Sequence, residues 1–224
     1  MKKLIVVFAV LASATACLAD TVWYGGDLSV GGMTSEAGYG RVWDNFQWNS
    51  SEDLAGVFGT FLTNFTPDLA SVTIREGVSE GNGGTVVYDA NNLSLSSTFL
   101  GNLAGLNVYS VDADLGSLSL VDGQTYWLSI GLNVGILDEA TVFDTDGANS
   151  VGSPVDDGNA FVSWPGFNFV NTVTAGGNAR YHDFSYGVRG APRDVSTPEP
   201  FTMGLGLAGV GLFVRRRMKR RGTR

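Results

Sequence analysis

The sequence TYWLSIGL, Thr125–Leu132, alternates between two kinds of side chain. Its even-numbered positions, from Tyr126 to Leu132, are all apolar, whereas Trp127 and Ser129 occupy odd-numbered positions. Because successive side chains of a β-strand point to opposite faces, this order places the apolar set on one face. A period of two residues therefore predicts a strand that buries one face in a core.

Runs of the same kind recur along the chain, separated by segments rich in Gly, Asn, Asp and Ser. In SVTIREG, Val72 and Ile74 share a face, and in HDFSYGVRG the alternate positions from His182 to Val188 share one. Further strands are expected near Tyr39–Trp48, Gly56–Leu62, Thr85–Tyr88, Leu106–Val111, Ser117–Leu120 and Phe161–Trp164.

Only Ser51–Ala55 and Asp138–Phe143 are candidates for helical turns, since no period of 3.6 residues persists elsewhere. Many short strands without crossover helices predict an all-β fold, an antiparallel β-sandwich for which a jelly roll is one arrangement. One domain spanning residues 20–190 is the simplest interpretation, followed by a linker at residues 191–197.

The N-terminus has the three parts of a secretory signal peptide, predicted to cover residues 1–19. Two lysines precede an apolar run, and small residues before the bond that follows Ala19 suit cleavage there. The stretch ending in Cys17 also resembles a lipoprotein processing box, but it lacks the large aliphatic residue at the first position. Cleavage after Ala19 removes the only cysteine, so the mature chain is expected to have no disulfide.

Charge is distributed unevenly along the chain. All 22 acidic residues and only five of the 14 basic ones lie between Asp20 and Val214, so this part has a formal charge of −17. Such a body repels nucleic acid and anionic lipid surfaces, and both are therefore poor candidate partners. Strong negative charge also favours solubility and can recruit divalent cations.

The C-terminus combines an uncharged span with a basic end. Phe201–Val214 has fourteen residues, which reach only about 21 Å as a helix, short of a hydrocarbon core of about 30 Å. Seven cations follow it, beginning with Arg215, Arg216 and Arg217, as the positive-inside rule expects of a cytoplasmic flank. Snorkelling of the arginine stems supplies part of the missing length. The tail is thus predicted to be a short transmembrane helix that stops in the inner membrane, at least transiently.

Pro198, Glu199 and Pro200 directly precede this span. The triplet, the Gly- and Leu-rich span and the arginines, residues 198–224, together resemble the PEP-CTERM sorting signal of Gram-negative bacteria that make extracellular polysaccharide. The resemblance implies that an exosortase, a membrane-embedded protease-transpeptidase, recognises the segment and cuts at or near the triplet. It further implies a final location at the cell surface or in the extracellular matrix, such as that of a biofilm.

The body is similar to the β-sandwich passengers that often precede this signal. The similarity rests on three segments: RVWDNFQW, QTYWLSIG and HDFSYGVRGAP. Those passengers mostly have no assigned activity, so this resemblance supports the fold and supplies no function.

The residue types needed for common catalytic sites are scarce. His182 is the only histidine, it shares a face with apolar residues, and no nucleophile elbow or second metal-ligating histidine accompanies it. Paired carboxylates can hydrolyse glycosides, but 22 acids nominate too many pairs to identify one. The sequence therefore predicts a non-enzymatic protein, with a glycan hydrolase as the less favoured alternative.

One polar loop offers hard oxygen ligands of the kind that Ca²⁺ prefers. Its spacing does not match a twelve-residue calcium loop, and a long solvated loop whose Asp and Asn residues cap turns is the favoured interpretation. No cofactor is predicted, and Ca²⁺ is the one ion that the loop would suit. The candidate ligands are Asp144, Asp146, Asn149, Asp156 and Asp157.

Five tryptophans allow a second hypothesis, a carbohydrate-binding module that stacks exposed indoles on sugar rings. Trp127 faces away from the core set of its own strand, and Trp164 lies in an aromatic stretch before Pro165. Packing in the core or at a sheet edge is the commoner role of tryptophan. An aromatic row on one sheet face would favour the hypothesis, and burial of both side chains would contradict it.

Overall fold

The computed structural model describes residues 19–29, 34–36, 40–135, 138–155, 157–164, 167–175 and 183–193. The chain divides into two compact units, Met1–Pro192 and Arg193–Arg224, and every described element belongs to the first. The elements are β1 (Asp20–Tyr24), β2 (Thr34–Glu36), β3 (Arg41–Gln47), β4 (Asp53–Thr63), β5 (Leu69–Glu76), β6 (Thr85–Leu103), β7 (Leu106–Leu118), β8 (Thr125–Leu132), β9 (Ala140–Thr145), β10 (Phe161–Trp164), β11 (Phe167–Asn171), α1 (Thr172–Ala175), β12 (Asp183–Phe184) and β13 (Tyr186–Ala191).

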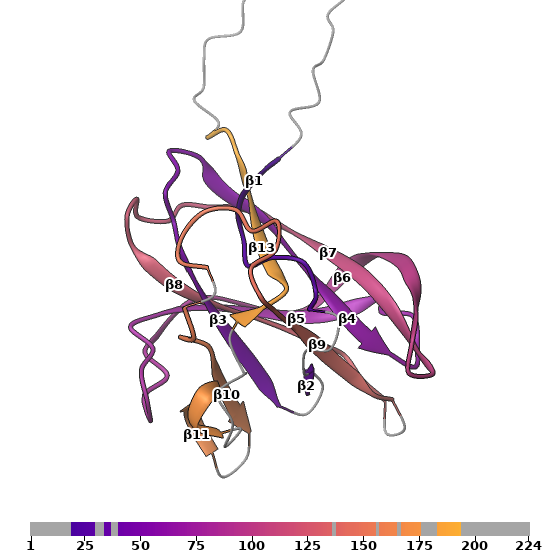
Figure 1. Cartoon of the computed structure of the whole chain (residues 1–224). Helices are drawn as coiled ribbons and strands as arrows, with labels where there is room; N and C mark the ends of the chain where they lie inside the picture. The colour runs from indigo at the N-terminus through magenta and orange to yellow at the C-terminus, as the bar shows by residue number, and fades with distance from the viewer. Residues whose placement is uncertain are drawn as a thin grey trace, which may run out of the picture. The chain divides into compact units, whose positions relative to one another are not determined.

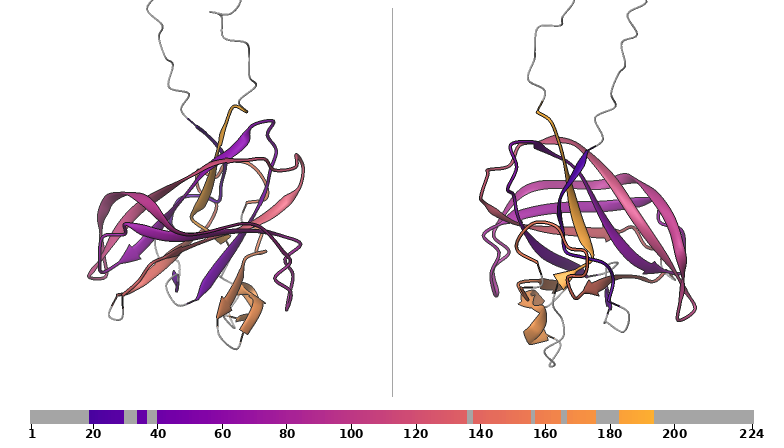
Figure 2. Two further views of the ribbon diagram at one scale, coloured as in Figure 1. Left: turned by 180° about the vertical axis from the view of Figure 1, so that it is seen from behind. Right: turned by 45° about the horizontal axis from the view of Figure 1, so that its top comes forward.

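These strands form a curled antiparallel sheet, a half-barrel (Figures 1 and 2). The order of neighbours is β1-β13-β4-β7-β6-β5-β8-β3-β10-β11, and β9 adds to β4, β12 and β2 away from this path. The sheet turns at β6, whose residues up to Ser94 pair with β5 and whose residues from Leu95 onward pair with β7. A single long strand therefore belongs to both halves of the sheet.

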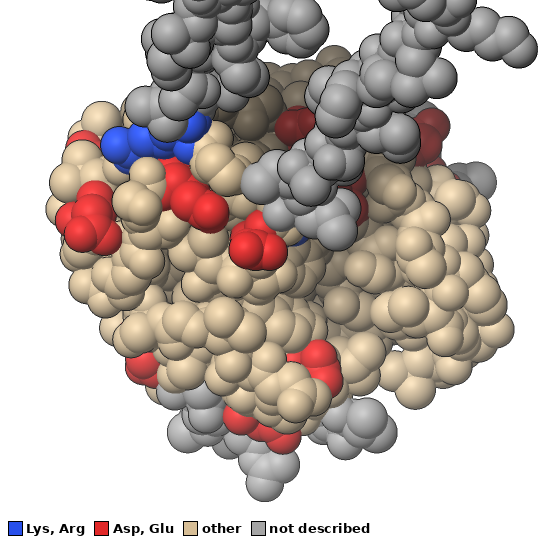
Figure 3. All heavy atoms as spheres, turned by 90° about the horizontal axis from the view of Figure 1, so that it is seen from above, with Lys and Arg blue, Asp and Glu red and all other residues tan. Residues whose placement is uncertain are grey.

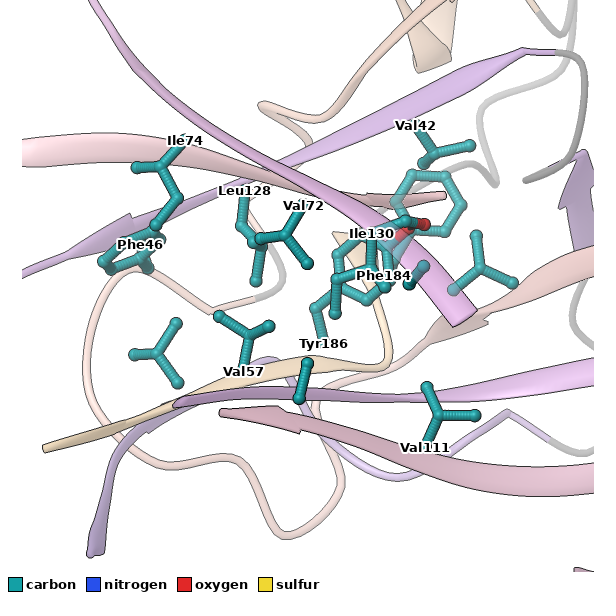
Figure 4. Close-up of a cluster of buried hydrophobic side chains, with 14 of the residues drawn as sticks. Val42, Phe46, Val57, Val72, Ile74, Val111, Leu128, Ile130, Phe184 and Tyr186 are labelled. Carbon is teal, nitrogen blue, oxygen red and sulfur yellow. Dashed lines mark hydrogen bonds between the residues drawn. The ribbon is translucent and has the colours of Figure 1, made fainter. Parts of the chain in front are cut away.

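The curl brings apolar faces of the two halves toward each other (Figure 4). Phe46, Ile74 and Leu128 come from the β5–β8–β3 half, and Val57 and Tyr186 come from the β13–β4–β7 half. All five are fully buried. Removal of such side chains from water is the dominant favourable contribution to folding, and it explains why the sheet closes over its own face.

The alternation predicted for Thr125–Leu132 is confirmed. This segment is β8, and its even-numbered residues, from Tyr126 to Leu132, all belong to the main core. The alternation predicts that the opposite face of β8 is exposed to solvent. That face is in fact largely covered, because Ser129 is fully buried and Trp127 is half-buried.

The two predicted helical turns are wrong. Residues 53–55 open β4 and residues 140–143 open β9, so strand structure begins where helix was expected. The Asp53 carboxylate accepts hydrogen bonds from the hydroxyl groups of Ser117 and Ser119, at 2.6 and 2.7 Å, and this pairing holds the start of β4 against β7. The only helix among the described residues is α1, a single turn.

The predicted strand Thr85–Tyr88 is much longer in the structure and continues to Leu103. The polar pair Asn91 and Asn92 hides this length in the sequence, and Asn92 has a left-handed φ of 60° within the strand. Hydrogen bonding to β5 and then to β7 keeps the segment extended despite its polar composition.

The start of β1 and the end of β13 lie together (Figure 1, top). Asp20 in β1 pairs with Gly190 in β13, and β13 pairs in turn with β4 through Ala191 and Asp53. Of the described helices, none is long and apolar enough to cross a membrane. Residues 1–18 and 194–224, which hold most of the predicted signal peptide and the whole sorting segment, lie outside the described residues.

Candidate functional site

The side of β3 that faces away from the main core carries a second apolar cluster. It joins Trp43 of β3 to Phe161 and Phe169 of the β10–β11 hairpin and to Val78, with half-buried Trp127 packed against it. Trp43 and Phe161 occupy paired positions of neighbouring strands, so the hairpin covers this side of the sheet.

An arginine is held over this cluster. The Arg75 guanidinium carbon lies 5.1 Å from the ring centre of Trp43 and 5.4 Å from that of Phe169. Its Nη1 donates a hydrogen bond of 3.0 Å to the carbonyl oxygen of Gly83. Aromatic rings attract a cation over their faces, so Arg75 stabilises the position of the hairpin while covering part of the aromatic surface.

A polar network continues from the aromatic cluster along the same side of β3. Asn45 pairs with Trp127 across the β3–β8 ladder, and its Nδ2 donates to the Asp157 carboxylate at 3.1 Å. The Trp127 indole Nε1 donates to the carbonyl oxygen of Asn159 at 3.2 Å. The backbone and side-chain nitrogens of Asn159 both donate to Asp157, so the turn that carries this carboxylate is fixed against β3.

Two buried carboxyl groups lie next to this network. Asp44 is fully buried, and its two oxygens accept hydrogen bonds from the backbone nitrogens of Asn45, at 2.9 Å, and Phe184, at 2.6 Å. Asp183 is 2% exposed and accepts a bond of 2.6 Å from the backbone nitrogen of Asp157. Asp44 therefore ties β12 to β3, and Asp183 ties the turn at Asp157 to β12.

Burial raises the pKa of Asp44 well above its ordinary value, and the charge of Asp183 raises it further. The backbone hydrogen bonds from Phe184 and Asn45 act in the opposite direction but do not offset the burial. The buried Asp44 carboxyl group therefore keeps its proton to a higher pH than a surface aspartate does. Because both groups are buried, a glycan cannot reach them as the acid and base of a hydrolase.

The sequence itself contains a signal for Asp44, in the alternation of β3. Within RVWDNFQ the core face of β3 carries Val42, Asp44 and Phe46, so the alternation itself places a carboxyl group among core residues. A charged residue is almost never fully buried without partners, so a carboxyl group at such a position is a candidate for a shifted pKa and a functional role. Asp183 gave no comparable signal, because its strand has only two residues.

The candidate calcium ligands are held by different partners. Asp144 is buried in β9 opposite Phe184, Asp146 is exposed, and Asn149 donates to the Asp27 carboxylate at 2.6 Å. Asp157 bonds to Asn45 and Asn159, as described above, and Asp156 lies outside the described residues. Within the described part of the chain, no three His, Cys, Asp or Glu side chains are arranged to hold a metal ion.

The tryptophans do not line up on one open face among the described residues. Trp23, Trp43 and Trp48 are buried, whereas Trp164 at the end of β10 is 38% exposed. Trp127 lies opposite Asn45, and Ser163, the neighbour of Trp164, lies opposite Arg41. The backbone positions of the two residues are therefore about five strand positions, or roughly 16 Å, apart along β3, and they lie on strands on opposite sides of it.

The processing residues stand mostly beyond the described part of the chain. Ala19 directly precedes β1, and Pro198, Glu199, Pro200, Arg215, Arg216 and Arg217 lie outside the described residues, as does His182. No protein-family model matches this chain, and no curated protein matches it.

Proposed function

We propose that this chain is an exported, acidic β-protein that an exosortase-like enzyme sorts to the cell surface or extracellular matrix. Its body then has a structural or adhesive role associated with extracellular polysaccharide, without catalytic activity. The observation that carries the proposal is the order of the C-terminal features: Pro198-Glu199-Pro200, the uncharged span Phe201–Val214 and the arginines from Arg215 to Arg217. The partners are the sorting enzyme, the inner membrane before processing and a polysaccharide, and the charge of −17 disfavours nucleic acid.

The boundaries of the sheet support this proposal. β1 begins at Asp20, the residue after the predicted cleavage position, and β13 ends at Ala191, seven residues before Pro198. Cleavage at both places would remove none of the strands that the structure describes. A seven-residue connection spans at most about 25 Å, so a sorting enzyme at Pro198 would work close to the folded body.

We also propose that the two halves of the curled sheet pack on each other as a β-sandwich. The support for this arrangement is the core shared by the two halves of the curled sheet, in which Phe46 and Leu128 face Val57 and Tyr186 (Figure 4).

Intact-mass measurement of the protein from cells and from medium tests the sorting proposal. We expect a mature mass that lacks residues 1–19 and everything beyond the Pro198–Pro200 region. Glu199→Ala should leave the tail in place, whereas Pro192→Ala, a matched change in the linker outside the triplet, should be processed normally. A mature protein that retains Phe201–Arg224 would refute sorting and make the tail a permanent anchor.

The exposure of Trp164 favours a second candidate, a carbohydrate-binding module with Trp127 as a further contact. Glycan-array binding by the purified protein should then fall after Trp164→Ala and remain after Phe99→Ala, which removes an exposed aromatic ring elsewhere. Equal loss in both variants, or no glycan binding at all, would dismiss this candidate.

A further inference from the structure

Three large apolar side chains are exposed next to the turn that joins β6 to β7. Phe99 is 53% exposed, Leu100 is 54% exposed and Leu103 is 42% exposed, all within five residues. We call these three residues the apolar tip. Large apolar side chains that gather on a soluble surface mark a site of interaction more often than singly scattered ones do.

The apolar tip belongs to one of the two longest uncharged stretches of the acidic body. No charged residue occurs between Asp89 and Asp112, although the body carries all 22 acids of the chain. The lobe at the right of Figure 3, where the hairpin ends, is correspondingly free of red and blue atoms. Charge repulsion between two bodies is therefore weak if they approach through this hairpin.

The same segment has an open strand edge. β6 pairs with β7 through Leu95–Leu103, but its pairing with β5 stops at Ser94. Two further bonds follow, from the Leu95 nitrogen to the Asp68 carbonyl and from the Ser97 hydroxyl to the Pro67 carbonyl. Among the described residues, no strand pairs with the second edge of Thr98–Leu103. An unpaired edge without lysine, proline or acidic residues is a template for another strand.

We propose that two copies of this chain associate through the Thr98–Leu103 edges, paired antiparallel about a two-fold axis near Leu100 and Gly101. A second copy fits because an isologous contact satisfies the same backbone groups on both sides and brings the two apolar tips together. The high negative charge of the body also disfavours an approach of two copies through their acidic faces. A partner of opposite charge would instead be attracted to the acidic remainder of the body.

The geometry makes this association weak. The register with β7 shifts between Phe99 and Gly101, and such a bulge twists an edge and shortens the stretch available for pairing. About six residues on each side also fall well below the 20–30 of a standard interface. The contact therefore requires a high local concentration of the chain, as when many copies are crowded on one surface.

The apolar tip lies far from the C-terminal end of β13. Ala191 pairs with Asp53 at the first residue of β4, whereas Asn107 of the hairpin pairs with Thr63 at its last. These positions are ten residues apart, or about 33 Å along the strand. A chain held at its C-terminal end would thus have its apolar tip available to another copy.

Cysteine cross-linking of the purified full chain tests the proposal, with Cys17→Ser in every variant. Leu100→Cys near the two-fold axis should form a disulfide-linked dimer under mild oxidation at high protein concentration. Val121→Cys is the matched control, because Val121 is 67% exposed and lies outside the hairpin. No dimer with Leu100→Cys, or an equal yield with Val121→Cys, would overturn the proposal.

A charge introduced on the edge identifies the contact more closely. Thr98→Lys in the Leu100→Cys chain should lower the dimer yield at least tenfold, because a two-fold axis between Leu100 and Gly101 sets position 98 opposite the apolar Leu103 of the other copy, where a lysine charge opposes strand pairing. Val86→Lys places the same charge on an exposed residue in the part of β6 that is already paired with β5, and it should leave the yield unchanged. A yield that Thr98→Lys does not lower would show that the cysteines meet through a contact other than the Thr98–Leu103 edge, and the edge proposal would be wrong.

Discussion

Replacement of Asp44 by asparagine should change how the stability of this protein depends on pH. The side chain keeps its size and one acceptor oxygen, but it can no longer ionise. In the wild type the folded state binds a proton at Asp44 more tightly than the unfolded chain does, because burial raises the pKa of this carboxyl group. Asp44 therefore contributes stability that is fully present below the unfolded pKa of about 4 and is lost as pH rises through the folded pKa.

The size of the effect follows from linkage. One group that holds a proton only in the folded state changes the free energy of unfolding by about 1.4 kcal/mol per pH unit. The wild type should lose stability relative to Asp44→Asn at up to this rate as pH rises above about 4. The absolute stability at one pH is less informative. The variant keeps only one acceptor for the backbone nitrogens of Asn45 and Phe184, and a lost bond of this kind costs about 1–3 kcal/mol.

Urea unfolding measured by tryptophan fluorescence between pH 4 and pH 8 provides the assay. Asp122→Asn, in an exposed loop, is the matched control for a change of one unit in net charge. The difference in free energy between wild type and Asp44→Asn should slope with pH, while the difference between wild type and Asp122→Asn should stay nearly level. Parallel curves for wild type and Asp44→Asn would refute the conclusion that burial raises the pKa of Asp44.

Three other experiments, with five substitutions, test the packing of the sheet and its turns. Gly25→Ala should lower the free energy of unfolding by about 1–3 kcal/mol, because its new Cβ would lie 2.5 Å from the Phe184 carbonyl oxygen. Gly131→Ala should lower it less, because only the flexible end of the Arg41 side chain obstructs the new Cβ. Urea unfolding compares the two variants, and an equal loss would contradict the backbone clash. Burial raises the pKa of Tyr24 to about 12, so the folded state should lose stability as pH rises from 10 to 12. Tyr24→Phe should remove that part of the loss, and unchanged alkaline unfolding would argue against it. Ala104 has a φ of 51° in the β6–β7 turn, so Ala104→Gly should raise stability by about 0.5–1 kcal/mol, and Gly105→Ala, at a φ of 87°, should lower it by about 1–2 kcal/mol. Thermal unfolding measures both, and a destabilised Ala104→Gly variant would contradict the assigned turn.

Local periodicity accounts for the parts of the fold that could be predicted. The alternation in Thr125–Leu132 identified β8 and its buried face, because the period of two belongs to the strand itself. The helical turn expected at Asp138–Phe143 failed because β9 depends on partners distant in sequence: Phe61–Thr63 of β4 and β2 near Thr34. A weakly patterned segment takes its structure from the strands beside it, and those are not visible in a short window of sequence.

The candidate site likewise combines features that local periodicity predicts with features that depend on distant strands. Trp127 was predicted to face away from the core, and it does, but its half-buried state depends on the β10–β11 hairpin and on Asn159. Asp44 and Asp183 are 139 positions apart, and only the sheet topology brings the two carboxyl groups close enough for one to raise the pKa of the other.

The sequence by itself determined the all-β class, the charge of −17 on the body and the order of the C-terminal features on which the sorting proposal rests, because each is a property of composition or of neighbouring residues. Only the tertiary structure decided that one sheet curls at β6, that Asp44 is buried between β3 and β12, and that the Thr98–Leu103 edge stays open. These features depend on which strands lie side by side. Strand pairing is settled by burial of one shared core across the whole chain, and no local pattern contains that information.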